Sequence, residues 1–249
     1  MPLLKAANLG FAYGGRPLFN GLSFELRRGD FMCVLGPNGS GKSTLLRLLT
    51  GYLRPGEGAV AVKGAPPGEL GPGALARLAA YVPSEQETPY DFTVRETVLL
   101  GRLARAGLWR GYTAVDEAAA GLAMAETGTE GLAGRSVNTL STGERQLVFI
   151  AQALTQEAPL LLLDEPTSHL DLRYKAQVMA LLARLAGSGK AVMAVLHEPG
   201  LARLGCNKAL LLGPGGEAGA VPAAEALSPD RLARVYGLPP GSPVLAARL

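Results

Sequence analysis

The feature that most constrains the fold is a glycine-rich segment between the apolar run Phe31–Leu35 and the leucine-rich run Leu45–Leu49. The segment consists of Gly36, Pro37, Asn38, Gly39, Ser40, Gly41, Lys42, Ser43 and Thr44. Its spacing satisfies G-x-x-x-x-G-K-[ST], the loop whose backbone N–H groups surround a phosphate at the N-terminus of a helix. An empty strand-to-helix turn is the alternative, but every fixed position matches. The sequence therefore predicts a strand, a triphosphate-binding loop and a helix, with Lys42 on the terminal phosphates and Ser43 on Mg²⁺.

Composition and charge restrict the partners and the location. The chain has 249 residues, enough for one large α/β domain or a core with a subdomain. Its formal net charge is only +3, and its Lys and Arg residues are scattered along the sequence, so the charge gives no reason to expect nucleic acid as a partner. Cys33 and Cys206 form no disulfide or metal motif. With no secretory signal pattern, and no apolar run approaching the roughly 20 residues that span a bilayer, we expect an intracellular protein or one held at a membrane by a partner.

The N-terminal quarter has the pattern of a small antiparallel sheet. Short apolar segments within Leu3–Glu25 are broken by glycine, proline and asparagine, which predicts β-hairpins. Ala59–Val62 is a second β pattern between glycines. Leu75–Ala80 is expected to be a short helix that leads into a strand, Ala80–Val82.

The middle of the chain is helical. Thr93 and Glu96 have the spacing of a capping box, and the alanine-rich segment Ala114–Glu126 predicts a further helix. Residues from about 88 to 140 thus form a helical insertion. Another helix begins after Leu140, and Ala158–Leu163 has the continuous apolar character of a strand buried on both faces.

The alternation of strand and helix then continues to the C-terminal part. The expected segments are a helix at Arg173–Ala186 and strands at Ala191–Leu196 and Ala209–Leu212, with loops at Gly64–Gly73 and Gly213–Pro222. This order is typical of an α/β fold with a mostly parallel sheet.

Two consecutive carboxylates, Asp164 and Glu165, end the buried strand. Ligands bind at the carboxyl edge of open α/β sheets, and adjacent acids are costly there without a cation. A nearby Mg²⁺ is therefore the favoured interpretation, and a solvated Asp-Glu turn before a proline is the alternative.

The segment Leu140–Gln146 places Ser141 as a helix N-cap with Glu144 three residues later. An ordinary helix start is one interpretation. The segment also resembles the signature motif of ATP-binding cassette (ABC) proteins, Leu-Ser-Gly-Gly-Gln or Glu, with Thr142 in place of the first glycine. This resemblance implies that Ser141, Gly143 and Glu144 bind, in trans, the γ-phosphate held by another subunit.

The resemblance extends to the carboxylates and to His197, which follows an apolar strand. It implies that Asp164 holds Mg²⁺ through water, as in a Walker B element, and that Glu165 is the general base that polarises the attacking water. His197 matches the switch histidine that contacts the γ-phosphate and the water, and Lys42 completes the catalytic set.

Two further segments match the family. Ser168–Asp171 resembles the D-loop, which crosses the dimer interface, and places Asp171 near the nucleotide, although Ser and Asp here also fit helix caps. His169 lies in this loop without a catalytic role. Tyr13 precedes a Gly-Gly turn where the family has an aromatic ring on adenine, and a tyrosine packed in a hairpin is the alternative.

The chain departs from the family at one position. A Val-Pro-Gln run normally supplies a glutamine to Mg²⁺ and the water, whereas here Ser84 follows Val82-Pro83 and Gln86 comes two residues later. Either Gln86 reaches the metal through a shifted loop, or Ser84 approaches it through water, or the coupling to the insertion is altered.

The resemblance runs from Tyr13 to about Tyr236 and implies an ABC ATPase fold: an α/β P-loop core with a mostly parallel sheet, a flanking antiparallel β-subdomain and an inserted helical subdomain. Residues 1–249 would form a single domain with its helical subdomain at about 88–140. The implied ligands are ATP and Mg²⁺. The implied partners are a second copy in a head-to-tail dimer, two integral membrane permease subunits and, indirectly, a substrate-binding protein, without nucleic acid. The expected location is the cytoplasmic face of the inner or plasma membrane.

Two segments, Asp91–Arg102 and Leu227–Gly237, resemble cassettes of importers for iron-siderophore, haem or cobalamin. ATP-driven uptake of such a metal chelate is therefore the expected function. The alternatives are import of another substrate such as a free metal ion, a soluble cassette ATPase acting on DNA or ribosomes, and a nucleotide-binding module that has lost turnover, which Ser84 would explain.

Overall fold

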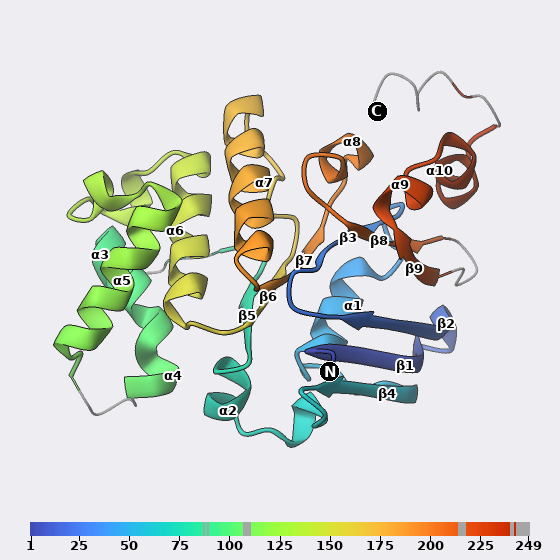
Figure 1. The fold of residues 1–249 in the computed structure, drawn as a ribbon, viewed down its shortest axis with the longest axis horizontal. Helices are drawn as coiled ribbons and strands as arrows, with labels where there is room; N and C mark the ends of the chain where they lie inside the picture. The colour runs from blue at the N-terminus through green and yellow to red at the C-terminus, as the bar shows by residue number, and fades with distance from the viewer. Residues whose placement is uncertain (87, 89, 107–110, 214–217, 240–241, 243–249) are drawn as a thin grey trace.

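The computed structural model describes residues 1–86, 88, 90–106, 111–213, 218–239 and 242, and all statements below concern these residues. They form two sheets with helices on both faces of the larger one (Figure 1). Among the described residues, no helix is both long enough and apolar enough to cross a membrane.

The larger sheet has six strands in the order β5-β6-β7-β3-β8-β9. These are β3 (Phe31–Leu35), β5 (Ala79–Val82), β6 (Leu160–Leu163), β7 (Ala191–Val195), β8 (Lys208–Leu212) and β9 (Ala218–Pro222). All are parallel except β9, which pairs antiparallel with β8. Because β6, β7 and β3 are adjacent and parallel, their carboxyl ends lie at one edge, and the segments that follow them meet there.

Two local expectations are wrong. The stretch Gly213–Pro222 is not a loop throughout, because Ala218–Pro222 forms β9. Its small residues carry little β signal, and β8 supplies the hydrogen-bond partners that make it a strand. The helix expected at Leu75–Ala80 lies earlier, as α2 (Pro72–Ala76) with proline in its first turn, since Ala79 and Ala80 pair with β6.

The smaller sheet confirms the predicted hairpin and second β pattern. It has three strands in the order β2-β1-β4, all antiparallel: β1 (Leu4–Tyr13), β2 (Arg16–Leu26) and β4 (Glu57–Val62). Helix α1 (Lys42–Leu49) lies between the two sheets (Figure 1). Its leucines join Met32, Val34 and the inward residues of β1 and β2 in one apolar core.

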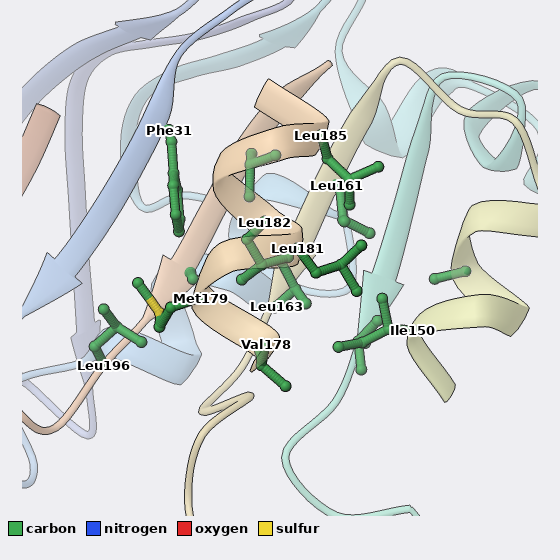
Figure 2. Close-up of a cluster of buried hydrophobic side chains, with 14 of the residues drawn as sticks. Phe31, Ile150, Leu161, Leu163, Val178, Met179, Leu181, Leu182, Leu185 and Leu196 are labelled. Atoms are coloured by element: carbon green, nitrogen blue, oxygen red, sulfur yellow. The ribbon is translucent and has the colours of Figure 1, made fainter. Parts of the chain in front are cut away.

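The opposite face of the larger sheet is covered mainly by α6 (Thr142–Thr155) and α7 (Leu172–Gly187). Leu161 and Leu163 of β6 point toward α7, whereas the alternate residues Leu160 and Leu162 face α1. Figure 2 shows Leu181, Leu182 and Leu185 of α7 above this face. Burial on both faces explains why the strand sequence is continuously apolar.

Helix α6 also packs against α3 (Val94–Leu99) and α5 (Ala114–Thr127), with α4 (Leu103–Ala106) nearby (Figure 1). The predicted capping boxes of α3 and α6 are confirmed, and α5 has a third at Thr113. Inside this group the buried Arg102 bonds the Asp116 carboxylate at 2.8 Å. The assignment of residues 88–140 as a separate subdomain stays a prediction.

The remaining elements are short. They are the helices α8 (Pro199–Ala202), α9 (Ala223–Ala226) and α10 (Pro229–Tyr236) and the 3₁₀ turns η1 (Pro67–Glu69), η2 (Leu100–Arg102), η3 (Glu130–Leu132) and η4 (Val137–Thr139).

Candidate functional site

The carboxyl edge of β3, β6 and β7 brings together the glycine-rich loop, the two carboxylates and His197. A pocket of about 580 Å³ opens there. Its lining residues are Tyr13, Leu18, Asn38, Gly39, Gly41, Lys42, Ser43, Thr44, Glu165 and His197. Segments more than 150 positions apart in the chain thus form one site, because the strand order places their ends side by side.

The loop after β3 has the backbone that a phosphate-binding loop needs. A Cβ on Gly36 would lie 2.1 Å from the carbonyl oxygen of Leu212, so only glycine fits there. Gly41, the N-cap of α1, has φ 92° and lets the N–H groups of the first turn face the pocket. Ser40 Oγ is buried and has no hydrogen-bond partner among the described residues, and such an orphaned hydroxyl suits a phosphate oxygen.

The side chain of Lys42 bonds to the backbone of its own loop. Its Nζ donates 2.9 Å hydrogen bonds to the carbonyl oxygens of Gly36 and Pro37. Burial lowers the pKa of Lys42, and the Glu165 and Asp164 carboxylates oppose that shift. A buried cation beside an orphaned hydroxyl is a favourable place for the anionic end of a nucleotide.

Ser43 and Asp164 form a fitting pair for Mg²⁺. Ser43 Oγ donates a 3.2 Å hydrogen bond to Asp164 Oδ1, and Asp164 is only 3 % exposed. Burial raises the pKa of this carboxyl, which reflects the cost of its charge without a cation. A hydroxyl and a carboxylate, completed by phosphate oxygens and water, are the oxygen donors that Mg²⁺ prefers.

Glu165 is held at both carboxylate oxygens. His197 Nε2 lies 2.7 Å from its Oε1, and Ser168 Oγ donates a 3.1 Å hydrogen bond to its Oε2. Glu165 has φ 52°, a left-handed conformation that is uncommon for a non-glycine residue and is concentrated at functional sites. His169, also at positive φ, is exposed and does not line the pocket.

Tyr13 fits both of its interpretations. Its ring packs edge to face on Phe11, with centroids 4.9 Å apart, as in a packed hairpin. It is also 48 % exposed and lines the pocket, so part of the side chain is accessible to a planar group.

The signature residues lie outside this pocket, at the start of α6. Ser141 and Glu144 bond each other and each other's backbone N–H in the capping box, and Ser141 is exposed. Gly143 is buried under Tyr174. Asp171 caps α7 by accepting from Tyr174 N–H at 2.9 Å and does not line the pocket, and its nucleotide contact stays a prediction.

Neither candidate for the missing glutamine lines the pocket. Gln86 Nε2 donates a 2.9 Å hydrogen bond to the carbonyl oxygen of Pro83, so its side chain folds back on its own loop. Ser84 is exposed. Which of them approaches Mg²⁺ in a nucleotide-bound state stays a prediction.

Two tyrosines next to the site were missed by the sequence argument. Tyr81 lies on β5 beside β6, and burial, together with the Asp164 carboxylate that accepts its hydrogen bond, raises its pKa to about 12. Tyr174 covers Gly143. Both contacts join residues far apart in the sequence and have no local signal. The position of Tyr81 near the end of a predicted strand was a weak indication of its contact with Asp164.

The loop, the lysine and the carboxylates on a parallel sheet define a P-loop nucleoside triphosphatase. A family model described as ABC transporter matches residues 19–168, more than half of the sequence. The chain belongs to the ABC transporter family, and the ATPase activity expected from the resemblance follows from that membership.

Relatives and solved structures agree with this assignment. The chain is 41% identical over 237 residues to the hemin import ATP-binding protein HmuV of Streptomyces coelicolor, covering 95% of this chain and 84% of the relative. It is 36% identical over 234 residues to the cobalamin import ATP-binding protein BtuD of Halobacterium salinarum, covering 94% of this chain and 58% of the relative. A solved inward-facing structure of a putative metal-chelate type ABC transporter has a TM-score of 0.86 at 34% identity, covering 96% of this chain and 90% of that one. The predicted family and fold class are confirmed.

Proposed function

We propose that this chain is the ATP-hydrolysing subunit of an importer and energises uptake of a metal chelate of the iron-siderophore, haem or cobalamin class through separate permease subunits. The observation that carries the chemical part is the pocket in which Glu165, bonded to His197, faces the phosphate-binding loop. The similarity to hemin and cobalamin import ATP-binding proteins supports the import part.

The loop residues would bind the triphosphate. Lys42 would exchange its carbonyl partners for the β- and γ-phosphate oxygens, and Ser40 Oγ would gain the partner that it lacks. Mg²⁺, held by Ser43 and through water by Asp164, would neutralise charge on the phosphates. The half-exposed Tyr13 would contact the base.

Glu165 and His197 would act on the attacking water. The carboxylate of Glu165 would take a proton from the water as the water oxygen bonds to the γ-phosphorus, and the bond to the β,γ-bridging oxygen would break with its electron pair remaining on ADP. The products are ADP and inorganic phosphate. His197, whose Nε2 lies 2.7 Å from Oε1, would keep the carboxylate oriented, and it lines the pocket in which the γ-phosphate would bind.

The site of one chain would be completed by a second copy. Ser141 is exposed at the N-terminus of the 14-residue helix α6, away from its own pocket. A head-to-tail dimer would place Ser141 and the N–H groups of this helix on the γ-phosphate bound to the partner's loop. ATP would then close the dimer, and hydrolysis would open it and move the permease.

The hydrolytic step is tested by Glu165→Gln, which keeps the size and loses the basic carboxylate. We expect phosphate release to fall by about 100-fold or more, as for loss of a general base, while ATP-dependent dimerisation persists. Glu198→Gln is the matched control, since Glu198 pairs with Lys175 and lies outside the pocket. Phosphate release by Glu165→Gln at the rate of the unmodified protein would exclude this role, and no release by the unmodified protein with its permease would favour a binding module without turnover.

The import role is tested by expressing the chain with its candidate permease and purifying the complex in detergent. In vesicles with a binding protein, ATP should drive accumulation of one metal chelate among a ferric siderophore, haem and cobalamin, and a free metal ion serves as the competing substrate. Uptake of the free ion alone would contradict the chelate assignment. Failure to associate with any polytopic membrane protein would contradict the importer role.

A further inference from the structure

The space beside Gly143, the second residue of α6, is occupied by a side chain of the same chain. A Cβ built on Gly143 would lie 2.3 Å from Cγ and 2.3 Å from Cδ2 of Tyr174. These separations are far below van der Waals contact. Cγ is the near end of the side chain, so it cannot move away without a change of rotamer or of backbone.

Backbone conformation does not explain the glycine. Gly143 is absent from the described residues with positive φ, and it lies inside a regular helix where alanine is preferred by about 1 kcal/mol. Glycine is therefore required at this position because there is no room for a side chain. Within this chain, the Tyr174 ring occupies that space.

Tyr174 is itself firmly placed. Its N–H donates a 2.9 Å hydrogen bond to Asp171 Oδ1 at the start of α7, and its half-buried ring packs against the core under that helix. A few residues earlier, Ser168, in the segment that precedes α7, donates a hydrogen bond to Glu165. The ring thus joins the N-terminus of α6 to the segment that carries the general base.

We propose that Tyr174 is a positioning residue of the composite ATP site: its ring on Gly143 sets where the N-terminus of α6, with Ser141, meets the nucleotide of the partner. The role rests on the proposed function. It assigns the missing side chain of Gly143 to packing within the chain, while the backbone N–H groups of this helix start would still meet the partner's phosphate.

The test is a size exchange across the contact. We expect Gly143→Ala to lower kcat by on the order of 100-fold, the loss typical of a displacement of about 1 Å, with little change in KM because the ATP-binding loop of the same chain is untouched. Tyr174→Phe keeps the ring and should keep kcat. In the double variant Gly143→Ala, Tyr174→Ala, the methyl group has room, and kcat should recover by about 10-fold over Gly143→Ala alone.

Matched controls separate this effect from general consequences of the substitutions. Gly121→Ala adds a methyl group inside α5 where no atom of the described residues lies within 4 Å, and Tyr52→Ala removes an 87 % exposed ring. Both should leave kcat unchanged. If the double variant is no better than Gly143→Ala alone, the glycine serves the partner's nucleotide and the proposal is overturned; it is equally overturned if Gly143→Ala has full activity.

Thermal unfolding of the unmodified protein, Gly143→Ala, Tyr174→Ala and the double variant tests the contact without any measurement of activity. Gly143→Ala should lower Tm markedly in the unmodified background and much less in the Tyr174→Ala background. An equal drop in both backgrounds would overturn the packing. If the unmodified protein neither hydrolyses ATP nor dimerises, the proposed function fails while this coupling is still measured, so the two failures are distinguishable.

Discussion

At the scale of single residues, the carboxylate of Glu165 has a partner at each of its two oxygens. His197 binds one oxygen and Ser168 the other, and the backbone of Glu165 itself is left-handed. Such a residue keeps one orientation because its surroundings fix it, which is what a general base requires.

Ser168→Ala tests this orientation. Removing the hydroxyl frees one oxygen of Glu165, so we expect kcat to fall about 10-fold with KM for ATP unchanged, because Ser168 does not line the described pocket. Steady-state ATP hydrolysis measures both constants. Ser188→Ala, which removes a hydroxyl bonded to Leu185 far from the pocket, is the control, and an unchanged kcat in Ser168→Ala would show that His197 alone orients the base.

At the scale of elements, α6 connects the helical group to the rest of the core through very close contacts. Gly101, just after α3, has no room for a side chain, since a Cβ would lie 2.1 Å from the carbonyl oxygen of Gln152 in α6. Because that atom belongs to a helix backbone, it cannot move without disturbing the packing.

Gly101→Ala should therefore lower the free energy of unfolding by about 2 kcal/mol, in the range of overpacking substitutions. Urea denaturation measures this change. Gly121→Ala, in open space within α5, should instead be neutral or stabilising by up to about 1 kcal/mol. Equal effects of the two substitutions would mean that α6 relaxes around the new methyl group.

The Arg102–Asp116 pair makes the stability of the helical group depend on pH. The Thr113 N–H and then the Arg102 guanidinium lower the pKa of Asp116 from 3.8 to about 2. Since the folded pKa is below the unfolded one, the pair contributes stability above about pH 4 and loses it as the pH falls toward 2.

Asp116→Asn should thus be less stable than the unmodified protein at neutral pH, because Arg102 loses a buried partner. The difference in Tm between the two proteins should shrink as the pH is lowered from 5 toward 2. Melting curves by circular dichroism across this range provide the measurement. Parallel curves would contradict a lowered pKa for Asp116.

At the scale of the whole molecule, the two halves of the proposed composite site lie on different surfaces of one chain. Lys42 lines the pocket, and the exposed Ser141 begins a helix elsewhere. A closed symmetric dimer would join each half to its complement, and this arrangement makes a mixing experiment possible.

We expect Lys42→Ala and Ser141→Arg to be inactive separately and partly active together. In a mixed dimer, one site carries both defects and the other carries neither, so an equal mixture should reach about a quarter of the unmodified ATPase activity if sites act independently. The ATPase rate after mixing is the measurement, and Lys42→Ala mixed with Glu165→Gln is the control because both defects affect the same half-site. No recovery in the first mixture would contradict sites shared between chains.

The features that the sequence determined are local. The phosphate-binding loop, the capping boxes at Thr93 and Ser141, and the buried strand that ends in Asp164 each depend on residues a few positions apart. Their backbone and hydrogen-bonding requirements are therefore written directly in the residue types. The family resemblance added His197 to the site, although its spacing alone could not.

Tertiary structure decided what depends on residues distant in sequence. The order of β6, β7 and β3 brings His197 to 2.7 Å from Glu165, β8 makes a strand of Ala218–Pro222, and α7 places Tyr174 on Gly143. No local pattern encodes these pairs, because each is set by the packing of whole elements against each other. The sequence by itself thus determined which groups could bind a triphosphate, and the fold decided which of them meet.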